Sequence, residues 1–559
     1  MCTILLKDDF DNLFLEIEVM EYINGFEFSK IDNTFVIPKM NKRDCFSEIM
    51  KYLNSEFNNQ ICAVYGLRRT GKSTLLKQSA LSLSTEQKEK AIFIKCDERT
   101  DFYNVIDFII DCLKKDYKYF FIDEITYAES FQSLATILSD DFVSDRGAKI
   151  IVSGADSLGL ELASRDLMYD RIKFITTSYT TYGEYKRLKN ISSIEDYIRH
   201  GSTLSDEKIE NYKVCKEYID TAIVDNIIHS LEKFESVSRR SINMLTEKYE
   251  YSEIKCEIEK GINKYSQARI LKAINKTFHS APLSDTKDLA KKNLLNISDI
   301  NFEKINERIA NLLGCNRNTS LILEDIKLIY DYLERIGVYT VINQYSDFDN
   351  TELCFHSNSG LFHSSLKYCL ESIKNSDDLY LTSNEEIKNF LITKAYQSAV
   401  GKIMENIVIG DVFHILCKGQ KENNINNIFG YLSGSEDRWY VGKIVKEINK
   451  QTHKVDLVVK DNEKHECFLF EIKRSTEIDN NQTYHLENRD FLNYITNNYG
   501  EVNGRYVLYC GQTTYSNGIP RINIDEFLIN LYRNKEKIYT IDSFEKLIGK
   551  NSKMQKCLQ

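Results

Sequence analysis

The segment from Gly66 to Ser73 reads GLRRTGKS, and this stretch decides the fold of the first part of the chain. It matches the pattern GxxxxGK[ST] at every fixed position. A short apolar run at residues 61–65 precedes it, and apolar residues recur at helical spacing from Ser73 to Leu83 after it. The sequence therefore predicts a buried strand, a glycine-rich loop and a helix, an arrangement that binds phosphate groups.

The residue types of this loop suit a nucleoside triphosphate. Glycines let backbone N–H groups turn toward the phosphates without a side chain in the way. Lys72 is predicted to reach the β- and γ-phosphates of ATP as a catalytic residue, and Ser73 is predicted to hold Mg²⁺. We expect ATP to be bound by Gly66, Leu67, Arg68, Arg69, Thr70, Gly71, Lys72, Ser73 and Thr74.

A second acidic motif supports this interpretation. Residues 119–124 read YFFIDE, an apolar strand that ends in two carboxylates, as in a Walker B element. Asp123 is predicted to bind the magnesium shell, and Glu124 to orient or deprotonate the attacking water. Ser153 ends the next apolar run, where it could sense the γ-phosphate.

Four short apolar runs define the fold class of this region. They lie at residues 61–65, 91–95, 117–122 and 149–152, with stretches long enough for crossover helices between them. Such runs are typical of buried parallel strands. We therefore predict an α/β P-loop NTPase fold of the AAA type with a parallel sheet.

The overall composition is that of a packed globular protein. Hydrophobic residues make up 42% and charged residues 28% of the 559 residues. No apolar stretch approaches the roughly 18 residues of a membrane-spanning helix, so a cytoplasmic protein without a membrane partner is expected. The 14 cysteines are scattered without a CxxC pair, which favours reduced thiols over a zinc site. The net charge of -10 neither supports nor excludes nucleic acid.

The motifs together resemble those of prokaryotic AAA-type ATPases, often called archaeal-type ATPases, that carry a C-terminal restriction-endonuclease-like domain. The resemblance extends from about residue 40 to about residue 515. The matching segments are residues 66–72 (GLRRTGK), 121–124 (FIDE), 153–157 (SGADS), 169–171 (YDR) and 182–185 (YGEY).

The resemblance implies a role for Arg171. An arginine at this position follows the sensor strand in the family, which suggests a phosphate-sensing or finger function. Such a finger is often supplied by a neighbouring subunit, so a homo-oligomer is a candidate assembly. Family members usually have glycine where this chain has Asp170. A surface salt bridge is the alternative role for Arg171.

The resemblance also implies a metal-dependent site near the C-terminus. Restriction-endonuclease-like folds place an aspartate on one strand and (Asp/Glu)-x-Lys on the next. Asp456 lies in one apolar run, and Glu471 and Lys473 end the following run, two residues apart and so on one side of a strand. Glu405, on a predicted helix, looks like the first acidic position of the family. Glu405, Asp456 and Glu471 are thus predicted metal ligands, with Lys473 catalytic.

Three interpretations of this region stay open. The tripeptide Glu-Ile-Lys occurs three times in the chain, and only the third copy follows an apolar strand with an aspartate-bearing strand upstream. The site could cleave DNA, the same carboxylates could survive as a structural or DNA-gripping site, or the region could be a surface hairpin with ordinary charges.

The middle of the chain reads as helical. Amphipathic segments occur at residues 285–295, 301–313 and 321–336, and a strand is predicted at 338–342. This pattern fits either a lid or a winged helix. The predicted domains are 1–40, an N-terminal extension; 41–203, the AAA-type core; 204–345, the lid or winged helix; 346–383, a connector; 384–535, the nuclease-like domain; and 536–559, a tail.

The leading functional hypothesis is an ATP-hydrolysing protein whose nucleotide state controls a linked nuclease-like domain acting on DNA. ATP and Mg²⁺ are the expected cofactors, and DNA is the expected macromolecular partner. The alternative is an ATP-gated regulatory module that binds DNA or protein and whose nuclease fold is catalytically silent.

Overall fold

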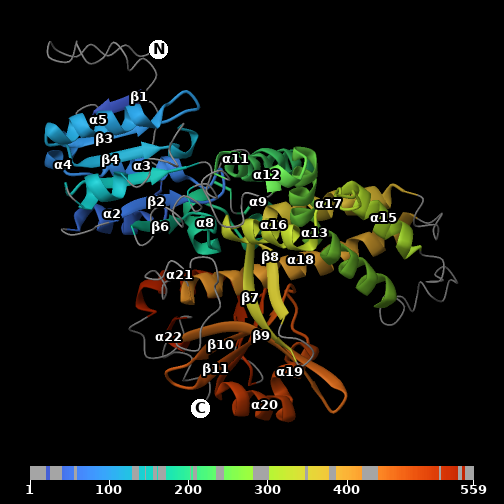
Figure 1. The fold of residues 1–559 in the computed structure, drawn as a ribbon. Helices are drawn as coiled ribbons and strands as arrows, with labels where there is room; N and C mark the ends of the chain where they lie inside the picture. Colours follow the sequence, from blue (N-terminus) through green and yellow to red (C-terminus); the bar gives the residue numbers. More distant parts are fainter. Residues whose placement is uncertain are drawn as a thin grey trace. The chain divides into compact units, whose positions relative to one another are not determined.

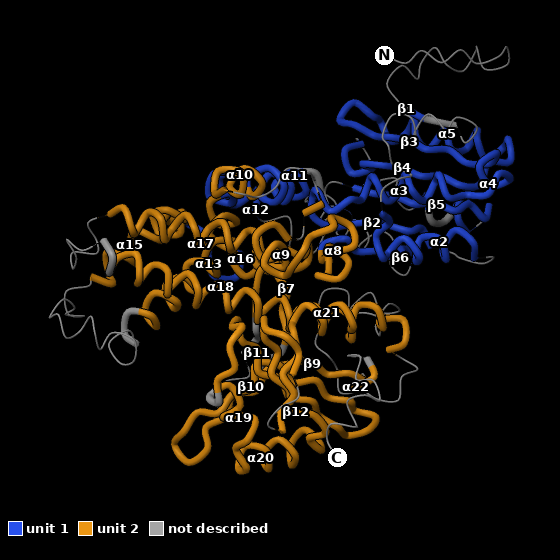
Figure 2. Tube along the Cα trace, turned by 180° about the vertical axis from the view of Figure 1, so that it is seen from behind, with its two compact units in different colours: residues 1–178, 220–255, 320–325 blue, residues 179–219, 256–319, 326–559 orange. Residues whose placement is uncertain are grey.

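The computed structural model of the chain forms two compact units (Figure 2). The first comprises residues 1–178, 220–255 and 320–325, and the second comprises 179–219, 256–319 and 326–559. The chain therefore passes from one unit to the other after residues 178, 219, 255, 319 and 325. The described residues are 21–24, 41–55, 60–128, 137–144, 146–154, 160, 171–201, 203–204, 211–234, 245–280, 301–346, 351–376, 385–417, 438–514, 518–538 and 544–547.

The first unit is built on a sheet of six described strands in the order β1-β3-β4-β5-β2-β6 (Figure 1). Strands β2 to β6 pair in parallel with their neighbours, as the apolar runs predict for β2 to β5, whereas β6 was not predicted and β1 pairs antiparallel with β3. All five residues of β2 and of β5 are buried, which is typical of a sheet covered on both faces. The strands are β1 Glu21–Asn24, β2 Ile61–Tyr65, β3 Ala91–Lys95, β4 Tyr119–Asp123, β5 Lys149–Ser153 and β6 Ile172–Thr176.

The strand order brings three chain segments to one edge of this sheet. Strand β5 lies between β2 and β4, with Val64 paired to Ser153. Because parallel strands end at the same edge, the segments that follow Tyr65, Asp123 and Ser153 are neighbours there. The strand, loop and helix order predicted around residues 61–83 is confirmed.

The helices of the first unit begin at residues that can cap them. Asp101 accepts a hydrogen bond from the Tyr103 N–H at the start of α5, and Ser84 forms a capping box with Gln87 at α4. The helices are α2 Phe46–Asn54, α3 Lys72–Leu81, α4 Thr85–Glu89, α5 Phe102–Lys114, η3 Ile125–Tyr127, η4 Leu138–Ser144, α11 Asp225–Phe234 and α12 Leu245–Lys248. A further short helix, η5 Ile219–Val224, begins at the last residue of a second-unit segment.

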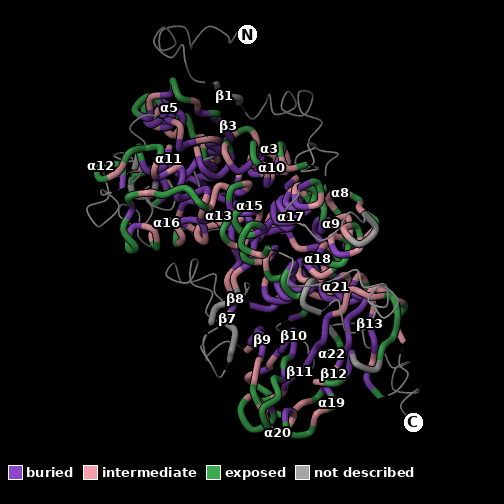
Figure 3. Tube along the Cα trace, turned by 90° about the vertical axis from the view of Figure 1, so that its right-hand side faces the viewer, coloured by how far each residue is buried: buried purple, intermediate pink, exposed green. Residues whose placement is uncertain are grey.

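The second unit is built on a sheet of seven described strands in the order β13-β12-β11-β10-β9-β7-β8. Strands β9, β10 and β11 form an antiparallel meander, and β12 and β13 continue in parallel from β11. Strands β10, β11 and β12 are coloured mainly purple, for buried, in Figure 3. The strands are β7 Tyr339–Ser346, β8 Thr351–His356, β9 Trp439–Ile448, β10 Gln451–Asp461, β11 Glu466–Lys473, β12 Glu501–Tyr509 and β13 Arg521–Asn523.

Two helices of the second unit are much longer than the rest, α13 Tyr251–Ser280 and α18 Glu385–Leu416. The first five residues of α13 are counted with the first unit. The remaining helices are α8 Tyr182–Lys189, α9 Ile194–His200, α10 Tyr212–Tyr218, α15 Phe302–Leu312, α16 Leu323–Arg335, α17 Ser359–Lys374, η9 Asn480–Thr483, α19 Tyr484–Glu487, α20 Arg489–Tyr499, α21 Ile524–Arg533, η10 Lys535–Lys537 and α22 Phe544–Leu547.

The strand predicted at residues 338–342 is part of β7, and its pairing bears on the middle region. β7 forms a hairpin with β8 and pairs in parallel with β9, Gln344 opposite Lys443. The hairpin thus belongs to the C-terminal sheet and is not the wing of a separate winged helix. A local sequence pattern could not reveal this, because the pairing joins segments about a hundred residues apart. The predicted helices at 301–313 and 321–336 are present as α15 and α16, and the one at 285–295 lies outside the described residues.

A buried carboxyl group on α18 gives the second unit a pH-dependent stability. Asp411 accepts hydrogen bonds from the Tyr179 hydroxyl at 2.9 Å and the Tyr182 N–H at 2.8 Å, and burial raises its pKa to about 7. Above about pH 4 the unfolded chain releases this proton while the folded chain keeps it, so the free energy of unfolding should fall by roughly 4 kcal/mol between pH 4 and 7. In Asp411→Asn this fall should largely disappear, as urea unfolding at pH 4 and pH 7 would measure.

The exposed Asp331, on α16 of the same unit, provides the control for this prediction. The Asp331→Asn variant should keep the pH dependence of the wild type. An unchanged pH dependence in Asp411→Asn would contradict the assignment of the effect to Asp411.

None of the described helices is both long enough and apolar enough to cross a membrane.

Candidate functional site

The loop after β2 adopts a backbone that only certain residues tolerate. Gly66 has φ +144°, and a Cβ atom at this position would lie 2.5 Å from the Thr177 hydroxyl oxygen. Gly71 has φ +90° immediately before α3 begins at Lys72. Both glycines are therefore needed by the backbone geometry, in addition to the access they give to phosphate oxygens.

Lys72 lies inside this loop. Its side chain is buried, and its Nζ donates to the carbonyl oxygens of Gly66 at 2.8 Å and Leu67 at 3.0 Å. The Thr70 hydroxyl donates to the same Leu67 carbonyl at 2.7 Å. The loop thus curves around the Lys72 ammonium group. Lys72 is the first residue of α3, and the N-terminus of a helix also favours a negatively charged ligand such as phosphate.

The carboxyl edge of the sheet brings the predicted magnesium ligands together. The Ser73 hydroxyl donates to Asp123 Oδ1 at 3.1 Å, and the Ser153 hydroxyl donates to the same oxygen. The Glu124 N–H donates to Ser153 Oγ at 3.4 Å, and Glu124 has φ +58°, a conformation that non-glycine residues adopt at a cost. A hydroxyl beside a buried carboxylate fits Mg²⁺, which takes oxygen ligands.

The two arginines predicted to act at this site, Arg68 and Arg171, lie at opposite edges of the sheet. The Arg68 guanidinium donates to the Tyr127 hydroxyl at 2.5 Å and to the Thr221 carbonyl at 3.2 Å. The Arg171 carbonyl accepts from the Ile61 N–H at 2.9 Å, at the amino edge of the sheet. Because the phosphate loop begins at the other end of β2, about 13 Å of strand separates it from the Arg171 backbone. The Arg171 backbone therefore lies at the opposite edge of the sheet from the phosphate loop of its own chain. Asp170 lies outside the described residues.

Arg43 supports the loop and was missed in the sequence. It is buried, and its guanidinium donates to the carbonyl oxygens of Thr70 at 2.7 Å and Thr177 at 3.3 Å. It thereby ties the loop to the segment after β6. No motif marks this residue, because its role depends on partners far along the chain.

A family model described as an AAA domain matches residues 58–186. This range contains the loop, Asp123, Glu124 and Ser153, so residues 58–186 are an AAA-type P-loop domain, a class of domain that generally binds ATP with Mg²⁺ and hydrolyses it. None of the curated proteins compared with the chain matches it.

Outside the AAA domain, a second cluster of charged residues lies where two strands of the C-terminal sheet diverge. The pairing of β10 with β11 stops at Leu457 and Phe470. Asp456 and Glu471 are the next residue on each strand, and both are 1% exposed. Two buried carboxylates are thus brought to one fork in the sheet.

A β-bulge shapes this fork. Val455 pairs with Ile444 and Val458 pairs with Gly442, so two residues of β10 face the single residue Lys443 of β9. Bulges re-aim side chains and are often found beside active sites. Here the bulge falls on Asp456 and brings it next to the Lys443 ammonium group.

Lys473 bridges the two carboxylates. Its Nζ lies 2.5 Å from Glu471 Oε2 and 3.4 Å from Asp456 Oδ2, which also accepts from the Ile472 N–H at 3.1 Å. Burial acts to raise the pKa of Asp456, but Lys473, Lys443 and Lys454 hold it well below its usual value. Asp456 therefore carries a negative charge at neutral pH.

Glu471 differs from Asp456 in its electrostatics. Burial and the neighbouring charge of Asp456 raise its pKa to about 8. Its Oε1 atom is buried and has no hydrogen-bond partner among the described residues. A bound cation would satisfy this oxygen and favour the ionised form, so the pair fits a divalent metal ion.

Glu405 is engaged by two lysines. Its Oε1 accepts from the ammonium groups of Lys402, one helical turn away, and of Lys443, at 2.5 Å. Burial and Asp456 act to raise the pKa of Glu405, but Lys443 and Lys402 outweigh them and lower it. Among the described residues, no group of three or more His, Cys, Asp and Glu side chains is arranged to hold a metal ion. The predicted metal ligands Glu405 and Asp456 instead have Lys443 between them, which contacts both carboxylates.

Further positive charge faces this cluster from α13. The pKa of Lys272 is lowered by partial burial and by the charges of Arg269, Lys443 and Lys454. Lys443 itself has a sequence signal that could have identified it, because a lysine inside the apolar run WYVGKIV is rarely buried without a partner. Lys402 and Lys272 have no such signal.

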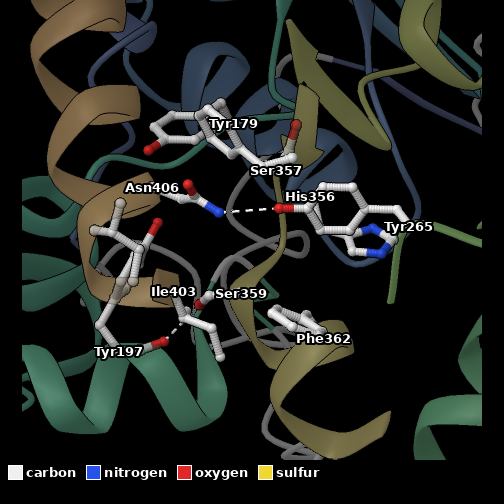
Figure 4. Close-up of a pocket in the computed structure, with 11 residues that line it drawn as sticks. Tyr179, Tyr197, Tyr265, His356, Ser357, Ser359, Phe362, Ile403 and Asn406 are labelled. Atoms are coloured by element: carbon white, nitrogen blue, oxygen red, sulfur yellow. Dashed lines mark hydrogen bonds between the residues drawn. The ribbon is translucent and has the colours of Figure 1, made fainter. Parts of the chain in front are cut away.

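A small cavity borders the same part of α18 (Figure 4). Asn406 lines the cavity and donates a hydrogen bond to the Tyr265 hydroxyl at 3.0 Å. His356 also lines the cavity, and burial lowers its pKa to about 3. The volume of the cavity, about 10 Å³, is that of a single water molecule. The cavity is too small for a nucleotide and is not a substrate site.

Proposed function

We propose that the chain hydrolyses ATP in its AAA domain and cleaves phosphodiester bonds of DNA at the fork between β10 and β11. The observation that carries the second part is the pair of buried carboxylates, Asp456 and Glu471, bridged by Lys473. The nucleotide state of the AAA domain is proposed to control the cleavage.

In this proposal each residue of the fork has a separate task. Asp456 and Glu471 would hold Mg²⁺, which when bound polarises a phosphoryl oxygen and lowers the pKa of water. Lys473, two residues after Glu471 on the same side of β11, would orient the attacking water and stabilise charge on the phosphate. The buried environment strengthens each of these interactions.

A cleft of the second unit is a candidate path for the nucleic-acid backbone. It has a volume of about 580 Å³. Its lining residue Arg199 lies on α9 one turn after Glu195, which pairs at 2.7 Å with Arg474, the residue that follows Lys473. Basic side chains with an aromatic ring suit a phosphate backbone and a stacked base. The cleft is lined in part by Arg199, His363, Lys367, Glu371, Lys374 and Tyr396.

In the AAA domain, Lys72 would contact the β- and γ-phosphates, Ser73 and Asp123 would hold Mg²⁺, and Glu124 would orient the water. Arg171 would act on the site of a neighbouring copy, which makes a homo-oligomer part of the proposal. Slow hydrolysis by isolated chains is the expected result.

A specific observation favours the alternative of a regulatory module that binds DNA without cutting it. Glu405, the third predicted metal ligand, is occupied by Lys402 and Lys443. With fewer free carboxylates and more ammonium groups, the fork could bind a phosphate without activating water.

The experiment that separates the two functions is a cleavage assay on plasmid and single-stranded DNA with Mg²⁺ or Mn²⁺, with and without ATP. The Lys473→Ala variant should cleave about 10²- to 10³-fold more slowly, because it lacks the charge next to the phosphate. The matched control is Lys460→Ala, on β10 of the same sheet and outside the cluster. DNA binding without cleavage by the wild type under every condition would favour the regulatory function.

A further inference from the structure

We propose that Lys443 forms a phosphate-binding position that works without a metal ion, and that Glu405 serves to hold this lysine and is not a metal ligand. The position would take a non-bridging oxygen of a DNA phosphodiester. The inference rests on the proposed action on DNA, but it does not require that the site cleaves.

The first argument is the charge of the cluster. Four described ammonium groups, those of Lys402, Lys443, Lys454 and Lys473, contact three carboxylates. Arg269 and Lys272 add positive charge from α13. Lys454 and Lys272 are exposed, so this excess of positive charge can be reached by an anion from solvent. The excess favours an anion as a ligand in addition to the metal ion of the fork.

The second argument is the position of Lys443. Its Nζ lies 2.5 Å from Glu405 Oε1 and 3.6 Å from Asp456 Oδ1, so it stands between the carboxylate on α18 and the carboxylate on β10. A metal ion bound to both carboxylates would have to lie beside this ammonium group, which like-charge repulsion opposes. The metal position left to the fork is that of Asp456 and Glu471.

The third argument is that Lys443 is held in place. The bulge in β10 fixes Lys443 opposite Asp456, and its side chain is 9% exposed. A lysine normally loses much conformational freedom when it binds a phosphate. Here Glu405 has already restricted the side chain, so less freedom remains to be lost on binding.

The test uses the full-length chain and fluorescently labelled single-stranded and double-stranded oligonucleotides in EDTA, so that no divalent metal ion contributes. Lys443→Met keeps the length of the side chain and removes its charge. Binding should be about 10- to 100-fold weaker, and the slope of log affinity against log salt should fall by about 1. Lys460→Met, on the neighbouring strand, should bind as the wild type does.

A second measurement tests the role of Glu405. Binding of Mn²⁺, followed by calorimetry without DNA, should be lost in Asp456→Asn and kept in Glu405→Gln. Loss of Mn²⁺ binding in Glu405→Gln to the same extent would overturn the assignment of Glu405. Unchanged affinity and salt slope in Lys443→Met would overturn the assignment of Lys443.

The outcomes for this inference and for the proposed cleavage can be told apart. Metal-free DNA binding that depends on Lys443, with no cleavage in any metal ion, would support the phosphate position and reject the nuclease function. Cleavage by the wild type, together with normal DNA binding by Lys443→Met, would support the nuclease function and reject the phosphate position. Thermal unfolding of each variant identifies any loss that comes from misfolding.

Discussion

ATP hydrolysis by the Lys72→Ala variant should fall by about 10²- to 10³-fold, the loss found when one charged donor to a transition state is removed. The lysine is buried in the loop and donates to two loop carbonyls, so it lies where the phosphates of ATP are expected. Alanine cannot replace its charge, and water that enters the space gives a much weaker interaction. The measurement is steady-state release of phosphate with Mg²⁺ and ATP.

The matched control is Lys114→Ala, a surface lysine in the last turn of α5 in the same unit. Its pairing with Asp111 is exposed, and hydrolysis should stay within about twofold of the wild type. Hydrolysis by Lys72→Ala at the wild-type rate would show that the loop is not the catalytic phosphate site. Nucleotide binding, followed separately, distinguishes lost affinity from lost chemistry.

DNA cleavage by the Asp456→Asn variant should fall by at least about 10³-fold, the largest effect expected in the second unit. Asp456 contacts Lys443, Lys454 and Lys473 and accepts from the Ile472 N–H. Asparagine keeps the size and the acceptor for Ile472, but it removes the charge that Mg²⁺ and Lys473 require. The measurement is the rate of nicking of supercoiled plasmid.

The same substitution has a second consequence that serves as an internal check. The loss of the Asp456 charge leaves three ammonium groups with less compensation, so metal-free binding of DNA should become tighter while cleavage is lost. A loss of both binding and folding would instead identify a structural role for Asp456. Asp331→Asn, on the exposed face of α16, is the matched control.

The sequence predicted those parts of the structure that depend on local pattern. The P-loop, four of the five parallel strands of the first unit and the two strands that carry Asp456 and Glu471 all follow from apolar runs. Each of these signals lies within about ten residues. The alternation along β11 also placed Glu471 and Lys473 on one side correctly.

The features of the fold that the sequence did not predict depend on pairing between distant segments of the chain. The antiparallel edge strand β1 and the parallel pairing of β7 with β9 join distant segments and have no local signal. The bulge opposite Lys443 arises from the register between two strands, and a register cannot be read from either strand alone. For the same reason the contacts of Lys443 with Glu405 and Asp456 could not be predicted, although a lysine inside the apolar run WYVGKIV marks it as a candidate.

The two units are discontinuous in sequence, and this limits which fragments of the protein can fold on their own. Both units are assembled from three separate stretches of sequence, so no single cut in the gene yields either one whole. A fragment that starts at residue 326 keeps Asp456, Glu471 and Lys473, but it loses Lys272 and also Glu195, the partner of Arg474. Isolated C-terminal fragments should therefore fold poorly.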